Sequence, residues 1–135
     1  MGACYLALRR YLALRDRSAG ADERAAIARR FVRLFERYAR LEHPDATVDN
    51  VARCEELFDR ACAHLDARRL ADAESGFDAV IKLVPSHYQS WSNLAVTLLM
   101  QQRRDQAERC LRRALELRPD YDVARRNLTM LERRG

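Results

Sequence analysis

The chain has 135 residues and a formal net charge of +5, with 48% hydrophobic and 33% charged residues, but only four glycines and three prolines. So few helix-breaking residues favour an all-α protein over a sheet or a disordered chain. No stretch approaches the roughly 20 apolar residues of a membrane-spanning helix. Four cysteines, Cys4, Cys54, Cys62 and Cys110, form no CxxC pair and no zinc-ligand spacing. We therefore expect a soluble, cytoplasmic protein with no metal and no other cofactor.

Two helices are predicted before residue 49. Residues 3–16 place apolar side chains on one stripe, and residues 23–42 carry the most regular seam in the chain. In the second helix the apolar residues recur at alternating spacings of four and three, which is the period of one helix face. That seam consists of Ile27, Phe31, Leu34, Tyr38 and Leu41. We expect residues 1–49 to form an N-terminal helical hairpin or extension.

Five further helices are predicted at 49–67, 70–84, 87–101, 105–117 and 121–133. Pro85 and Pro119 each interrupt the chain between two of them, since proline cannot continue a helix. Ser86 and Gln89 have the spacing of a capping box at the start of the 87–101 helix. Asp120 is the expected cap of the last helix. The pattern of predicted helices therefore indicates an all-α fold class, as the composition does.

Two of these helix pairs repeat each other at a spacing of 34 residues. Residues 54–87 align with residues 88–121 so that small residues meet small ones and large meet large. Pro85 falls on Pro119, for example, and Phe77 on Leu111. Such a period is typical of stacked hairpin units, each too small to bury its own apolar face. Units of this kind build binding surfaces more often than active sites.

The repeated spacing resembles that of the tetratricopeptide repeat (TPR) family. The second copy carries the family's pattern of large and small residues at Trp91, Leu94, Ala95, Leu98, Ala107, Leu111, Ala114 and Pro119, and the first copy carries a weaker version. The resemblance covers about residues 50–133, and the expected domain of residues 50–135 consists of two repeats (54–87 and 88–121) with a capping helix (121–133). It implies a short right-handed superhelix of helical hairpins.

The resemblance also implies where a partner would bind, because the first helix of each hairpin lines the concave side of such a superhelix. On this sequence the partner-binding residues would be Phe58, Cys62, Leu65, Gln89, Asn93, Val96, Leu99, Met100, Asn127 and Met130. This groove would be apolar in the middle and polar at its edges. Some family members hold an acidic peptide end there with a clamp of lysine, asparagine and arginine. Only Asn93 of that clamp is present, so such a ligand is not expected.

The leading hypothesis is a scaffold or adaptor that binds a peptide or helix of another protein in this groove. A second hypothesis is a homo-oligomerisation module, with a homodimer through Ile27, Phe31, Leu34 and Tyr38, or a fragment of a longer solenoid. The 23–42 helix could also fill the groove from within. RNA binding through arginine-rich helix faces is a weaker alternative, since no basic stripe with interleaved aromatics is present. Partners on a membrane are not expected.

An enzyme is not expected, and no catalytic residue is predicted. The sequence holds no nucleophile elbow, no phosphate-binding glycine loop and no HExxH zinc motif. His64 and His87 are expected to be packing and loop residues of the repeats.

Overall fold

A computed structural model describes residues 47–134 of the chain. The predicted 3–16 and 23–42 helices, with the seam of Ile27, Phe31, Leu34 and Tyr38, lie outside the described residues. The chain divides after Arg53 into two compact units, Met1–Arg53 and Cys54–Gly135. The repeats, the core and the candidate site all belong to the second unit.

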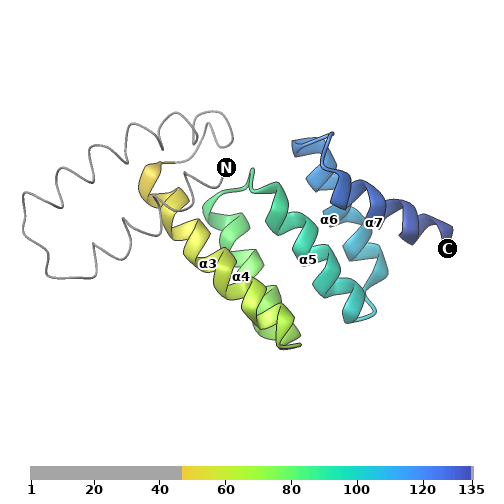
Figure 1. The fold of residues 1–135 in the computed structure, drawn as a ribbon, viewed down its shortest axis with the longest axis horizontal. Helices are drawn as coiled ribbons and strands as arrows, with labels where there is room; N and C mark the ends of the chain where they lie inside the picture. Colours follow the sequence, from red (N-terminus) through yellow and green to blue (C-terminus); the bar gives the residue numbers. More distant parts are fainter. Residues whose placement is uncertain (1–46, 135) are drawn as a thin grey trace, which may run out of the picture. The chain divides into compact units, whose positions relative to one another are not determined.

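Five α-helices and no strand make up the described residues (Figure 1). They are α3 (Val48–Asp66), α4 (Leu70–Leu83), α5 (Tyr88–Met100), α6 (Arg104–Leu117) and α7 (Asp122–Arg133). Each boundary lies within one residue of the sequence prediction. The all-α fold class is confirmed.

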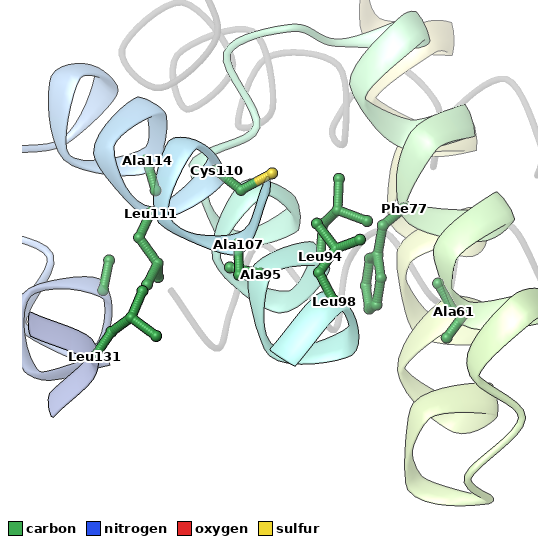
Figure 2. Close-up of a cluster of buried hydrophobic side chains, with 12 residues drawn as sticks. Ala61, Phe77, Leu94, Ala95, Leu98, Ala107, Cys110, Leu111, Ala114 and Leu131 are labelled. Atoms are coloured by element: carbon green, nitrogen blue, oxygen red, sulfur yellow. The ribbon is translucent and has the colours of Figure 1, made fainter. Parts of the chain in front are cut away.

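The core of the second unit is a row of small and large apolar side chains shared by all five helices (Figure 2). Phe77 and Leu111, from α4 and α6, are fully buried and are the largest side chains in it. Alanines at Ala61, Ala95 and Ala107 are almost inaccessible to water. Small residues at these points let the helix backbones approach closely, and the large residues fill the space between hairpins. The alternation predicted from the 34-residue repeat is thus the alternation that packs the core.

One contact shows how close the helices of the first hairpin lie. A Cβ atom added to Gly76 of α4 would lie 2.7 Å from the Cβ atom of Ala61 in α3. That distance is well inside van der Waals contact, so the crossing of α3 and α4 leaves no room for a side chain at residue 76. Phe58 and Phe77 pack next to this crossing, with ring centroids 5.9 Å apart.

The turns inside the two hairpins have the same backbone geometry at a spacing of 34 residues. Arg68 and Gln102 both adopt left-handed conformations, with φ of 61° and 63°. The amide of Arg69 donates to the carbonyl of His64, at 2.9 Å, and the amide of Arg103 donates to the carbonyl of Leu98 at the same distance. These are the bonds of a Schellman motif, which ends a helix by satisfying its last carbonyl groups. The 34-residue repeat in the sequence is therefore also a repeat of backbone conformation.

The caps predicted for two helices are wrong. The N-cap of α5 is His87, whose side chain accepts a hydrogen bond from the amide of Ser90. The Ser86 capping box does not form, and the Oε1 atom of Gln89 is buried with no hydrogen-bond partner among residues 47–134. The N-cap of α7 is Tyr121, with no side-chain cap bond, whereas Asp120 pairs with Arg118 at 3.0 Å. An imidazole nitrogen thus takes the acceptor role that sequence rules assign to small oxygen-bearing side chains.

Candidate functional site

One face of α5 carries the centre of the predicted binding site. Gln89, Asn93, Val96 and Met100 follow one another at helical spacing and are half-buried. We call this set the α5 site face. Asn93 donates through Nδ2 to the Sγ atom of Cys62 in α3, over 3.5 Å. Arg68, in the turn between α3 and α4, donates to the Sδ atom of Met100 over 3.7 Å. The structure therefore brings α3 and α5 together along this face.

The predicted residues of α3 divide into two groups. Cys62 lies on the site, in contact with Asn93. Phe58 packs instead between Phe77 and the ring of His87, whose centroid is 4.9 Å away. Leu65 likewise packs against the core and is only half-buried. Most of the apolar surface of Phe58 is therefore used inside the molecule and less of it is left for a ligand.

The predicted residues of α7 line a hollow with the end of α5. Leu99, Asn127 and Met130 border a cavity of about 310 Å³, together with Gln102, Arg104, Leu131 and Arg134. We call it the α5–α7 hollow. Arg104 spans its floor, because its guanidinium donates to the carbonyl oxygens of Leu131 and Arg134 at the end of α7. Met130 is 54% exposed, and with Val123 it is one of two large hydrophobic side chains in residues 47–134 that water reaches freely.

Residues 58–122 match the family model of the tetratricopeptide repeat. This part of the chain is a tetratricopeptide repeat region. The TPR match begins within α3 and runs to the start of α7, so it contains both equivalent turns. The resemblance found in the sequence is confirmed. No curated protein matches the chain. The tetratricopeptide repeat is typically a non-catalytic scaffold for protein–protein interaction.

Within residues 47–134, no helix of the TPR region or its flanks is long and apolar enough to cross a membrane. Over that range, no three histidine, cysteine or acidic side chains gather as a metal-binding set.

The thiols of Cys54, Cys62 and Cys110 all favour their neutral form. Burial raises the pKa of Cys62, and the nearby carboxylates of Asp59, Asp66 and Glu55 act in the same direction, while the hydrogen bond from Asn93 opposes them. Burial also raises the pKa of Cys54, and it raises the pKa of Cys110 to about 11. A thiol is nucleophilic as its thiolate. These cysteines therefore act as small packing groups.

His87 is the residue of this region whose role the sequence prediction only partly captured. Its Nδ1 atom accepts from the amide of Ser90 at 3.2 Å and lies 2.8 Å from the Ser90 hydroxyl. Because a backbone N–H can only donate, Nδ1 is the unprotonated nitrogen, and Nε2–H faces the Oε1 atom of Glu55 at 3.4 Å. The packing role expected of His87 is confirmed, as the residue is 1% exposed. Its bond to Glu55, which joins the start of α5 to α3, has no signal in the sequence.

Proposed function

We propose that the TPR region is a scaffold that binds a peptide or helix of a partner protein across the α5 site face and the α5–α7 hollow. The observation that carries this proposal is the combination of exposed Met130 with a 310 Å³ hollow beside it. An apolar side chain at the rim of a cavity favours a binding surface, because clefts lined by apolar groups are where ligands bind most often. Methionine also adapts its shape to different apolar surfaces.

The ends of the site supply polar groups that would position the backbone of a ligand. Asn93 and Asn127 each carry an amide with both a donor and an acceptor. The Oε1 atom of Gln89 has no partner among residues 47–134, and a ligand N–H would satisfy it after a rotation of the side chain. Affinity would come mainly from burial of Leu99, Met100 and Met130, at roughly 1.5–3 kcal/mol for each fully buried side chain.

The proposal is tested by selecting peptides from a random display library on the immobilised full chain. The double variant Leu99→Asp with Met130→Asp should lose most of the selected peptides, because it puts two carboxylates on the hollow. A control variant, Ala71→Asp with Thr129→Asp, makes the same charge change at two exposed positions outside the site. Both variants should keep the far-UV circular dichroism of the parent. Retention of all peptides by the hollow variant would remove this proposal.

Homo-oligomerisation is the second candidate function, and the exposure of Val123 and Met130 on one helix favours it. A second copy could cover these side chains in place of a partner. Size exclusion with light scattering at several concentrations separates the two candidates. A mass that falls on dilution, and a monomer in the Leu99→Asp, Met130→Asp variant, would favour self-association over the adaptor role in the cytoplasm that the sequence suggested.

A further inference from the structure

A second hollow lies in the TPR region, between α4 and α6, with α5 as its floor. It has a volume of about 440 Å³, which is within the range of ligand sites in proteins. We call it the α4–α6 trough. Its lining residues come from three helices and the turn before α6, and they are Glu74, Asp78, Trp91, Leu94, Leu98, Arg103, Gln106, Arg109, Cys110 and Arg113.

The trough and the α5 site face use opposite sides of α5. Successive residues of an α-helix are rotated by about 100°. Trp91, Leu94 and Leu98 therefore cluster on one side of α5, and Asn93 and Met100 point about half a turn away from them. The trough shares no lining residue with the α5–α7 hollow. Substitutions can thus disable one surface without touching the other.

The floor of the trough is apolar and rigid. Leu94 and Leu98 are 5% and 3% exposed, so they are fixed in the core, as Figure 2 shows for both side chains beside Cys110. Trp91 is half-buried, and its Nε1–H donates to the carbonyl of Pro85 at 2.9 Å. That bond satisfies the polar atom of the indole and fixes the ring. What remains for a ligand is an aromatic and aliphatic surface.

The walls of the trough carry charge of opposite sign, and the balance is positive. On the α4 side, Glu74 is already paired with Arg103 at 2.6 Å. On the α6 side, Arg109 is exposed and forms no ion pair with any side chain in residues 47–134. Arg113 pairs with Glu116 at 2.9 Å, but both side chains are largely exposed, so this pair is weak and easily exchanged.

Asp78 offsets only part of that positive charge. Burial raises the pKa of its carboxyl, and neighbouring Glu74 acts in the same direction. Lys82 and Arg103 act in the opposite direction, and Asp78 is itself exposed, so water screens part of its charge. An added carboxylate would be attracted to Arg109 and Arg113 and would lie on the far side of the trough from Asp78.

The shape of the trough indicates what kind of molecule fits. Its α6 wall runs from Arg103 to Arg113, which is about 15 Å at a rise of 1.5 Å per residue. That length matches four or five residues of extended chain at roughly 3.3 Å each. We propose that the α4–α6 trough is a second docking site, for a short acidic peptide segment of a partner that lays a bulky apolar side chain on Trp91 and Leu94 and a carboxylate between Arg109 and Arg113.

Trp91 is the only tryptophan of the chain, so its fluorescence reports directly on the trough. The experiment uses the full chain and the same display library. The selected peptides are then sorted by whether they still bind to each of the variants that follow. Arg109→Glu with Arg113→Glu reverses the α6 wall, and Arg126→Glu with Arg133→Glu makes the same charge change at exposed positions of α7. The Leu99→Asp, Met130→Asp variant identifies peptides that bind the other face.

We expect one class of peptides in which aspartate or glutamate lies next to phenylalanine or leucine. Their binding should shift the Trp91 emission, weaken by about tenfold or more in the reversed-wall variant, and survive in the α7 control and in the Leu99→Asp, Met130→Asp variant. The proposal is overturned if no such class is selected, or if its peptides bind without changing the emission or equally well to the reversed wall. A shift of the emission on simple dilution would overturn it too, because a second copy would then occupy the trough. None of these outcomes decides the proposal for the α5–α7 hollow.

Discussion

Trp91 and Arg125, which lie 34 residues apart, make the same backbone contact with different chemistry. Trp91 Nε1 donates to the carbonyl of Pro85 at 2.9 Å, and an Nη atom of Arg125 donates to the carbonyl of Pro119 at 2.7 Å. Each bond spans six residues and closes the turn that leads into α5 or α7. Arginine thus keeps the turn in place while presenting a charge to water, which suits the final helix of a repeat array.

The first prediction concerns this contact. Trp91→Phe keeps an aromatic ring on the floor of the trough but removes the donor, so we expect the free energy of unfolding to fall by about 1 kcal/mol. Arg125→Met should cost under about 0.5 kcal/mol, because its side chain is 59% exposed and water replaces the lost bond. Urea unfolding followed by circular dichroism measures both. Equal losses would show that the Trp91 bond carries no more weight than a surface contact.

Gly76 should be intolerant of the smallest side chain. Gly76→Ala improves helix propensity by about 1 kcal/mol, yet its methyl group would lie 2.7 Å from the Cβ atom of Ala61. We expect a net loss of about 1–3 kcal/mol from overpacking. The neighbouring exposed Ser75→Ala serves as the control and should be neutral or slightly stabilising. Addition of Ala61→Gly to Gly76→Ala should recover part of the loss, and a failure to do so would contradict the close approach.

The left-handed backbone conformation of Gln102 should lower the stability of the protein. Its φ of 63° favours glycine, so Gln102→Gly should raise the free energy of unfolding by about 0.5–1 kcal/mol. Gln101, one residue earlier, has a φ of −88°, and Gln101→Gly should be neutral or destabilising. Thermal denaturation of the two variants side by side checks the difference. A higher melting temperature for Gln101→Gly than for Gln102→Gly would refute the assignment.

His87→Ala removes the cap of α5 and the link to Glu55 together. We expect a loss of about 2 kcal/mol, since a cap bond and a half-buried charge-assisted contact both disappear. His87→Asn should fall between the parent and His87→Ala, because asparagine is a good cap but is too short to reach Glu55. Chemical unfolding ranks the three proteins. An Asn variant no better than Ala would mean that the cap bond contributes little.

Because of Cys110, the free energy of unfolding of the TPR region should fall as the pH rises into the alkaline range. Its pKa is raised from the usual 9.0 to about 11 in the folded chain. Between about pH 9 and pH 11 the unfolded chain therefore loses this proton and the folded chain keeps it, so the free energy of unfolding falls as pH rises. Below about pH 9 the contribution is constant. Cys110→Ala should show a shallower fall than the parent over this window, whereas identical slopes would contradict the burial of the thiol.

Helix positions could be predicted from the sequence because they depend on local periodicity. The Leu94–Met100 run and the prolines at Pro85 and Pro119 fix where helices lie, and each boundary was right to within one residue. The helix caps were harder to predict from the sequence. Sequence rules favour Ser86 as the cap of α5, but His87 accepts from the amide of Ser90, and its second nitrogen gains Glu55 as a partner 32 residues away. That long-range contact outweighs the local preference.

The candidate site divides in the same way. The resemblance to the tetratricopeptide repeat placed Cys62 and Asn93 on the same side of the hairpins, and the two side chains are in contact. Spacing could not reveal that Phe58 turns toward Phe77 and His87, since a half-buried position on a helix can face either neighbour. The α4–α6 trough also has no sequence signal, because Glu74, Trp91 and Arg109 come together only when the hairpins stack.

The bond between Glu55 and His87 has a consequence for how the protein unfolds. It belongs to a series of contacts that join the α3–α4 hairpin to the α5–α6 hairpin and its N-cap, as do Cys62 with Asn93 and Glu74 with Arg103. In a linear array, stability is held partly in such junctions between neighbours. The two hairpins are thus cooperatively coupled, and loosening the first should speed amide hydrogen exchange in α5, although no residue of α5 has changed.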